Sequence, residues 1–345
     1  MIIDAYNHIL PKKYQETLEK KAPDRDTTLP SSNWSKTVTP LLDLEARFRV
    51  MDAFDEYIQV ITVAAPPAYS IAPPPLAVEL CKIANDELAE LVHKYPDRFA
   101  AGVATLPMND PEAAVAEAER AIKDLRLRGV EIFTDILGKP LDSLDFIPLY
   151  EKMEEFGRPI YIHPRRLMTK PDYEGEEFSK YRLWTKLGWP YETGLAMCRL
   201  VYSGVMERFP GLKIITHHSG GIIPYLAGRL DWADDVNETL MGLRDIDLKE
   251  HALVYFRRFF FDTAVSGNTG ALQCTHLFAG SEQMLFGTDV PFGSQLGRRL
   301  IRQAIEAVEG MGLSDAEKRK IFQDNAIKLL RLPLGYPVWT SKEIA

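Results

Sequence analysis

The stretch Lys213–Arg229, KIITHHSGGIIPYLAGR, guides the interpretation of the whole chain. A short β-branched run at residues 214–216 leads directly into His217 and His218 and then into two glycines. β-Branched residues favour strands, and adjacent glycines let the backbone turn sharply and approach a ligand closely. We therefore expect a strand that delivers imidazole side chains to a tight turn at its C-terminal end. Two histidines at one strand end are also compatible with a simple turn cap, so the other strands decide between these interpretations.

Strand-like and helix-like segments alternate on both sides of this stretch. The predicted strands are residues 1–8, 57–63, 99–106, 129–133, 159–164, 214–216, 258–262 and 284–286. The predicted helices are residues 43–54, 76–95, 111–127, 146–156, 191–208, 268–279, 297–309 and 315–331. This alternation predicts an α/β fold, a single (β/α)8 TIM-type barrel formed by residues 1–345. A doubly wound open sheet is the structural alternative, but no glycine-rich phosphate turn follows the first strand.

Two polar segments interrupt the alternation. Residues 12–42 follow the first strand, and residues 165–189 follow the fifth. Segments of this length between regular elements are commonly lids or binding loops. We therefore expect both to be loop or lid insertions in the barrel.

The composition limits the classes of partner. The 345 residues carry a formal net charge of -8, so there is no basic excess with which to neutralise a nucleic acid backbone. The three cysteines form no C-x-x-C pair, which favours buried thiols in a reducing compartment. We find neither a leader-like N-terminus nor an apolar run of membrane-spanning length. The expectation is a cytoplasmic protein whose partner is a small molecule, with no nucleic acid or membrane partner.

Polar side chains stand at the C-terminal ends of four predicted strands. Tyr6 and His8 end the first strand, His163 the fifth, His218 follows the sixth and Asp289 the eighth. The C-terminal ends of barrel strands share one rim, so these side chains are predicted to meet there in a functional site. Imidazoles and a carboxylate are ligands for a divalent ion, with zinc the first choice and manganese or iron as alternatives.

At this point a resemblance is apparent. The motifs IDAYNHILP, IHP, THHSGGIIPYLAGR and FGTDVP occur in this order at strands one, five, six and eight. Together they resemble the amidohydrolase superfamily, in particular the branch that contains aminocarboxymuconate-semialdehyde decarboxylase and the γ-resorcylate decarboxylases. The resemblance covers nearly the whole chain and implies a metal-dependent enzyme on a (β/α)8 barrel.

The resemblance also implies roles for individual residues. His8, His163 and Asp289 correspond to ligands of a metal ion. His218 corresponds to the general acid/base of the family, and His217 is then a neighbouring structural residue.

The first strand departs from the family pattern. The usual H-x-H is Tyr6-x-His8 here, so the first metal histidine is missing. Tyr6 could bind the ion as a phenolate, or it could donate a hydrogen bond to substrate while three protein ligands hold the ion, or metal affinity could have been lost. We favour the second interpretation, because three protein ligands and a water suit a catalytic ion. Residues 131–133 stand where two-metal relatives have a bridging lysine, so one ion is expected.

Three further residues are candidates for substrate binding. The resemblance implies that Arg47 and Arg229 hold a substrate carboxylate, Arg229 by reaching into a neighbouring subunit, which implies a homodimer. A guanidinium suits this task because it is always charged and binds carboxylates in a bidentate manner. The alternatives are a solvated helix face for Arg47 and an ion pair with Asp231 or Asp234 for Arg229. Trp184 could cover a planar substrate or simply pack within its segment.

The leading functional hypothesis is a metal-dependent, non-oxidative decarboxylase that acts on a carboxylated aromatic or dienoic acid. The first alternative is a metal-dependent hydrolase or hydratase that uses the same ion on a small carboxylic acid or lactone. The second is a non-catalytic barrel that has lost its metal.

Overall fold

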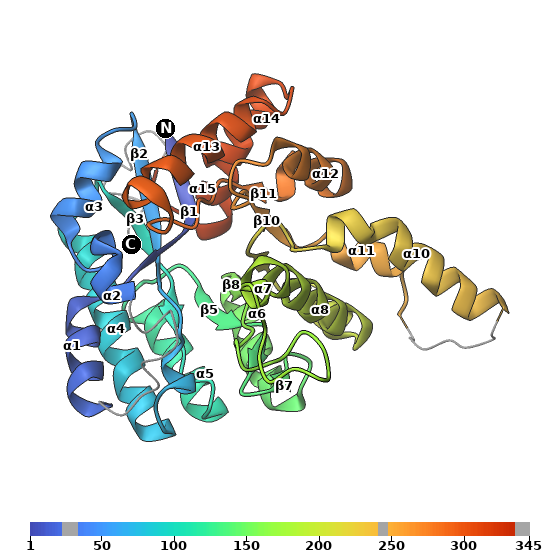
Figure 1. The fold of residues 1–345 in the computed structure, drawn as a ribbon, viewed down its shortest axis with the longest axis horizontal. Helices are drawn as coiled ribbons and strands as arrows, with labels where there is room; N and C mark the ends of the chain where they lie inside the picture. The colour runs from blue at the N-terminus through green and yellow to red at the C-terminus, as the bar shows by residue number, and fades with distance from the viewer. Residues whose placement is uncertain (23–33, 241–247, 335–345) are drawn as a thin grey trace, which may run out of the picture.

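The computed structural model describes residues 1–22, 34–240 and 248–334, and it contains strands at all of the predicted positions (Figure 1). The third predicted strand is divided into two by Val103. The seventh and eighth are shorter than predicted. The parallel strands are β1 (Ile2–Ile9), β2 (Tyr57–Val63), β3 (Phe99–Gly102), β4 (Ala104–Thr105), β5 (Val130–Phe133), β8 (Ile160–His163), β9 (Ile214–Thr216), β10 (Phe260–Asp262) and β11 (Met284–Leu285).

These strands form two parallel sheets, with the orders β1-β2-β3 and β11-β10-β9-β8-β5-β4. One chain segment joins them, because Val103 N donates to Ile61 O at 3.0 Å and Ala104 N donates to Gly129 O at 2.9 Å. The fold is therefore α/β with parallel sheets, as predicted, and the strands all end on the same side. A short antiparallel hairpin, β6 (Asp135–Ile136) and β7 (Lys139–Pro140), lies apart from both sheets.

The first strand also contacts the last. Ala5 N donates to Phe286 O and His8 N donates to Val290 O, each at 2.7 Å. Backbone hydrogen bonds thus join β1 to the segment that follows β11. This contact brings residues from the two ends of the sequence to the same place.

The helices follow the strands in sequence. The helical segments are α1 (Lys12–Lys21), α2 (Trp34–Thr37), α3 (Leu44–Met51), α4 (Pro74–Lys94), α5 (Pro111–Lys123), α6 (Ile147–Phe156), α7 (Leu183–Lys186), α8 (Gly188–Tyr202), α9 (Val205–Arg208), α10 (Ile223–Leu240), α11 (Ala252–Phe256), α12 (Thr269–Ala279), α13 (Arg298–Glu309), α14 (Asp315–Arg319) and α15 (Asn325–Leu330). Capping residues fix several ends: Asp110 accepts from Ala113 N before α5, and Gly157 ends α6 with φ +58°.

Several segments differ from the prediction. The predicted helix 191–208 is two helices, separated at Gly204, whose φ is +80°. The predicted helix 315–331 contains a π-helical turn at Lys320–Asp324. Residues 12–42 are not loop throughout, because α1 packs on α4, where Lys12 N and Lys13 N donate to the Glu87 carboxylate. Residues 23–33 of that insertion lie outside the described part of the chain.

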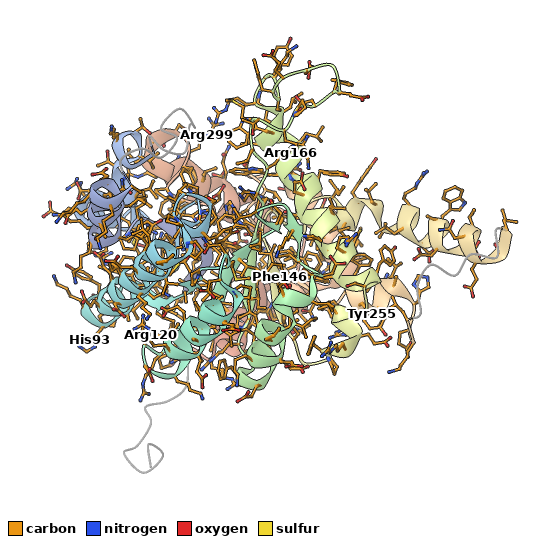
Figure 2. The ribbon with its side chains drawn as sticks, turned by 90° about the horizontal axis from the view of Figure 1, so that it is seen from below. His93, Arg120, Phe146, Arg166, Tyr255 and Arg299 are labelled. Atoms are coloured by element: carbon orange, nitrogen blue, oxygen red, sulfur yellow. The ribbon has the colours of Figure 1, made fainter. Side chains whose placement is uncertain are left out.

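The strand ends define one end of the molecule. The segment between β8 and α8 projects from this end, with Arg166 near its base, whereas His93 and Arg120 lie at the opposite end (Figure 2). Strands β5 and β8 are buried along their whole length, which fits their mainly apolar sequences and also buries Glu131 and His163. Among the described residues, no helix has the length and apolarity needed to cross a bilayer.

Candidate metal centre

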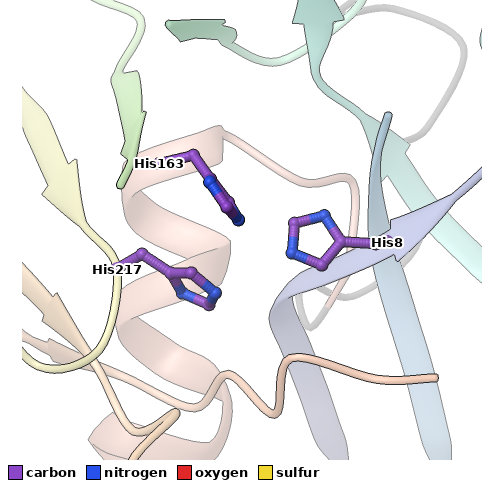
Figure 3. A group of neighbouring side chains, drawn as sticks. All are labelled: His8, His163 and His217. Carbon is purple, nitrogen blue, oxygen red and sulfur yellow. The ribbon is translucent and has the colours of Figure 1, made fainter. Parts of the chain in front are cut away.

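Three histidines converge at the C-terminal ends of strands (Figure 3). His8 comes from β1, His163 ends β8, and His217 directly follows β9. One ring nitrogen from each lies within 4.8 Å of the other two, and all three side chains are buried. The structure therefore brings together two of the predicted metal ligands with a histidine that was expected to be structural.

The outer nitrogen of each ring is occupied by the protein. His8 Nδ1 lies 2.9 Å from Thr62 Oγ1, whose hydroxyl donates to Asn7 O, and His163 Nδ1 lies 2.8 Å from Pro164 O. His217 Nδ1 bonds the carboxylate of Asp262. Such contacts fix the imidazole tautomer and leave Nε2 as the ligand atom, as in the outer shell of metal sites.

Asp289 completes the centre from the segment after β11. Its Oδ1 lies 3.3 Å from His8 Nε2 and 3.5 Å from His217 Nε2, and its Oδ2 lies 3.7 Å from His218 Nε2. Burial alone would raise the pKa of Asp289. His217, His218 and His8 outweigh this effect and hold the pKa well below its usual value. The carboxylate is thus ionised and flanked by imidazoles.

The protonation states of His8 and His163 fit a divalent ion, whereas that of His217 opposes one. Burial lowers the pKa of His8 and lowers the pKa of His163 strongly, which favours neutral rings. Burial also acts to lower the pKa of His217, but the Asp262 and Asp289 carboxylates outweigh it and raise the pKa to about 10, so an ion would compete with a proton there. The Nε2 atoms of His8 and His217 are buried without a hydrogen-bond partner. Buried imidazole nitrogens that face one ionised carboxylate are a fitting ligand set for one divalent cation.

The turn after β9 places the two adjacent histidines. His218, Ser219, Gly220 and Gly221 all have left-handed φ values, between +55° and +75°. A Cβ at Gly221 would lie 2.2 Å from Pro190 O, so only glycine fits there. The compact turn lets His217 and His218 both face Asp289.

Tyr6 lies beside the centre. Its ring stacks on His217 with a centroid distance of 4.0 Å, and its hydroxyl donates to Glu131 Oε1 at 3.1 Å. Burial and the Glu131 charge raise the pKa of Tyr6 well above its usual value, which disfavours a phenolate ligand. Burial also raises the pKa of Glu131, to about 8.

Arg47 reaches the centre indirectly. Its guanidinium donates to Gln59 Oε1 at 2.7 Å, to the backbone oxygen of His8 at 2.7 Å and to Asn7 Oδ1 at 2.5 Å. Only 2% of the residue is exposed. The guanidinium therefore binds the end of β1, and this geometry does not present it to a ligand of the histidines.

Arg229 does not join the centre in this chain. It is exposed on α10 and lies over the Trp232 ring, 5.0 Å from the centroid. The ion pairs considered from the sequence are not formed, because Asp231 pairs with His251 and Asp234 accepts from the Tyr202 hydroxyl.

Trp189, which was not predicted from the sequence, contacts two of the histidines. It stacks on His218 at 6.1 Å and meets His163 edge-on at 5.5 Å, whereas Trp184 contacts Trp189 at 5.7 Å. Phe292 lies 5.7 Å from His8 on another side. Trp184 therefore contacts Trp189, and Trp189 in turn contacts His163 and His218.

Asp262 and Glu131 were also missed as site residues. Asp262 ends β10 just as His163 ends β8, so the rule that selected the other residues applied to it as well. Glu131 lies within β5 and is recognisable only through its three-dimensional contact with Tyr6.

A cavity of about 590 Å³ opens beside the same end of the strands. Its lining includes Thr134, Asp135, Arg165, Arg166 and Glu192, and none of the histidines of the centre. Arg165 pairs with Asp135, and Arg166 and Lys170 share the carboxylate of Glu192. Arg199, which also lines the cavity, pairs with Asp142, so each of these cations has a carboxylate partner.

The fold and the centre together define a class, an α/β protein with a cluster of potential metal ligands at the C-terminal ends of parallel strands. The family model described as amidohydrolase (Amidohydro_2) matches residues 4–332, and the chain belongs to this family. The predicted family is therefore confirmed.

Similar proteins include decarboxylases. The γ-resorcylate decarboxylase of Polaromonas sp. is 32% identical over 88% of this chain and 92% of its own length. The 2-amino-3-carboxymuconate-6-semialdehyde decarboxylase of Dictyostelium discoideum is 29% identical over 96% and 91%. A solved dihydroxybenzoic acid decarboxylase from Polaromonas sp., with bound manganese and 2-nitroresorcinol, is 28% identical, has a TM-score of 0.77 and covers 96% of each chain. Decarboxylases are the enzyme class that the sequence predicted.

Proposed function

We propose that this protein is a metal-dependent, non-oxidative decarboxylase that removes CO2 from a carboxylated aromatic acid. The observation that carries the proposal is the set of buried histidines whose Nδ1 atoms are fixed by the protein and whose Nε2 atoms converge beside Asp289. The names of the relatives support a carboxy-lyase over a hydrolase or hydratase.

The ion would be held by His8, His163 and Asp289. When bound, a divalent ion supplies positive charge that attracts the substrate carboxylate and a neighbouring oxygen. The preference for zinc lacks support, since a solved relative contains manganese, and we propose a single divalent ion with manganese and zinc both as candidates.

His218 is the proposed general acid. Its ring stacks on Trp189, its Nε2 lies 3.7 Å from Asp289 Oδ2, and 19% of its side chain is exposed, which leaves access for a substrate. His218 gives its proton to the ring carbon that carries the carboxylate. The bond from that carbon to the carboxylate then breaks, its electron pair restores the aromatic ring, and CO2 leaves.

Aromatic side chains suit a planar substrate. Trp189 and Phe292 flank the histidines, and Trp184 supports Trp189 from behind. Tyr6 is proposed to hold His217 and Glu131 in place. Arg47 is proposed to position His8 through its backbone oxygen rather than to bind the substrate carboxylate.

The wider architecture follows the same proposal. We propose that the two sheets form one (β/α)8 barrel, supported by the segment shared at Val103 and by the hydrogen bonds between β1 and the segment after β11. Residues 1–345 would then be one domain, with residues 12–42 and 165–189 as insertions. The second insertion projects on the side of the centre, as a lid would (Figure 2).

A cytoplasmic homodimer is the proposed assembly. Helix α10 extends away from the rest of the molecule (Figure 1) and exposes Tyr225, Trp232 and Leu240. An exposed aromatic and aliphatic surface of this kind suits burial against a second copy. Arg229 on the same helix would then reach the partner's centre.

Carbon dioxide release from hydroxybenzoates and from carboxyvanillate tests the reaction, using protein stripped with a chelator and reloaded with manganese or zinc. We expect activity only in the reloaded protein, and we expect His218→Asn to lower turnover by about 10² to 10⁴ while metal content stays at one ion per chain. Hydrolysis of a lactone or ester without CO2 release would favour the hydrolase alternative. Wild-type protein that binds no metal would leave only the non-catalytic barrel.

A further inference from the structure

We propose that His217 coordinates the divalent ion together with His8, His163 and Asp289, and that Asp262 orients His217 for this role. The inference rests on the proposed function, because it presumes that the centre holds a metal ion. It changes the ligand set that the sequence motifs imply.

His217 is the member that links the two groups of potential ligands. One group contains His8, His163 and His217, and the other contains His217, His218 and Asp289. The two predicted histidine ligands fall in the first group and Asp289 in the second, and His217 is the residue that the two groups share. His217 therefore lies next to the ligands from β1 and β8 as well as to the carboxylate after β11.

The distances at Asp289 distinguish the two adjacent histidines. His8 Nε2 and His217 Nε2 approach the same oxygen, Oδ1, at 3.3 and 3.5 Å. Ligand atoms about 2.1 Å from a shared ion lie roughly 3 to 3.5 Å from each other. His218 Nε2 instead approaches Oδ2, at 3.7 Å. Oδ1 is thus the oxygen that would share an ion with His8 and His217, and His218 lies at the outer oxygen.

The other ring nitrogen, Nδ1, distinguishes His217 from His218 independently of these distances. His8, His163 and His217 each have Nδ1 in contact with a protein oxygen, whereas His218 Nδ1 is buried without a partner. A metal-binding imidazole normally donates its other N–H to a carboxylate or carbonyl. Asp262 meets this requirement for His217 and is itself held by Ser219 N at 2.9 Å and Ala264 N at 3.1 Å.

Tyr6 is not a competing ligand. Its hydroxyl donates to Glu131 at 3.1 Å, and its ring lies flat against His217. The tyrosine therefore acts on the centre by limiting the orientations of the His217 ring.

A coordination number follows from this ligand set. Four protein ligands fill a tetrahedral shell, so an open position for substrate requires an ion that takes five or six ligands. Manganese meets that requirement more readily than a rigid four-coordinate zinc.

Metal affinity, measured independently of catalysis, tests the inference. The informative variant is His217→Asn, because an asparagine amide can replace Nδ1–H toward Asp262 but cannot reach the position of Nε2. Its matched control is His218→Asn at the next residue. Chelator-stripped proteins are titrated with Mn²⁺ and Zn²⁺, and bound metal is counted by elemental analysis.

We expect His217→Asn to lower metal affinity by at least about 100-fold and Asp262→Asn by about 10- to 100-fold. His218→Asn and Tyr6→Phe should bind metal within about threefold of the wild type. A His217→Asn protein that binds one ion with wild-type affinity would overturn the inference and leave the proposed function intact. Wild-type protein without metal would instead overturn the proposed function.

X-ray absorption of the wild-type protein loaded with Mn²⁺ or Zn²⁺ gives a second test that does not depend on how any variant folds. Three coordinated imidazoles are expected. Two imidazoles would contradict a coordinating role for His217.

Discussion

At the scale of single residues, the centre depends on side chains that hold other side chains. Arg47, Asp262 and Thr62 do not contribute to the cluster of ring nitrogens, yet each bonds an atom of a histidine that does. In a buried site, such contacts fix a ligand more firmly than the packing of its ring alone. Their loss is therefore expected to affect stability and metal affinity together.

Arg47→Met tests whether this arginine acts on the protein or on the substrate. The change leaves acceptor atoms of Asn7, His8 and Gln59 buried without their donor. We expect the free energy of unfolding to fall by about 3 kcal/mol, since each unsatisfied buried group costs roughly 1 to 3 kcal/mol. Urea denaturation measures this loss. Arg49→Met, on the exposed side of the same helix, is the control and should change stability by less than about 0.5 kcal/mol. A large rise in KM with unchanged stability would instead favour the predicted contact with substrate.

Glu131 predicts a pH dependence of stability. Burial raises the pKa of its carboxyl to about 8 in the folded protein, against a reference value of 4.5. Between these two pH values the carboxyl of Glu131 holds a proton in the folded state that it has released in the unfolded state. The contribution of Glu131 to folding stability is therefore fully present below pH 4.5 and is lost as the pH rises through 8. The slope from this group is at most about 1.4 kcal/mol per pH unit.

The test compares metal-free wild-type protein with Glu131→Gln by denaturation between pH 5.5 and 8. The glutamine variant should show a flatter decline in stability with rising pH, because its side chain does not titrate. Glu45→Gln on an exposed helix face should keep the wild-type slope. Parallel curves for the wild type and Glu131→Gln would disprove the assignment.

At the scale of elements, the turn after β9 explains what could and could not be predicted. The strand, the histidine pair and the glycines are visible in the sequence, and so is their position at a strand end. In a regular strand, adjacent side chains point to opposite faces, and one of two consecutive histidines would face away from the centre. The left-handed backbone that begins at His218 ends this alternation, so both rings face Asp289. That outcome depends on Pro190 and Phe261, which pack against the turn from distant parts of the chain.

Gly221→Ala should therefore disrupt the centre. Its Cβ would lie 2.2 Å from Pro190 O, and the backbone would have to keep a positive φ. We expect a loss of stability of order 3 kcal/mol, together with weaker metal binding.

The matched control is Gly138→Ala in the β6–β7 hairpin, where φ is also positive but no atom lies within 4 Å of the added Cβ. This control isolates the backbone term of about 1 kcal/mol. Thermal melting measures the loss of stability in both variants. Equal losses would show that steric contact with Pro190 contributes nothing.

At the scale of the whole molecule, local patterns in the sequence predicted the parallel α/β fold and the strand ends. They did not predict α10 or the burial of Arg47, because both depend on contacts between segments distant in sequence. Asp262 illustrates an intermediate case, since its place at a strand end was visible but its partner His217 was not.

The proposed homodimer can be tested by complementation. Arg229→Met and His218→Asn should each be nearly inactive alone. A mixture that has exchanged subunits should regain part of the activity, because a heterodimer holds one site in which both residues are intact. Trp232→Glu should weaken the dimer in sedimentation experiments, whereas Leu144→Glu, an exposed change on another element, should not. A monodisperse monomer that stays active at every dilution would contradict the dimer.

The hydrogen bonds between β1 and the segment after β11 have a consequence for synthesis of the chain. A nascent polypeptide acquires His8 almost at once, and the other two imidazoles of the cluster by residue 217, but Asp289 comes only after another seventy or so positions. Until Asp289 has been synthesised, the imidazoles lack their shared carboxylate. Tight binding of the ion is thus expected only in a chain whose β1 has already formed its hydrogen bonds with the segment after β11.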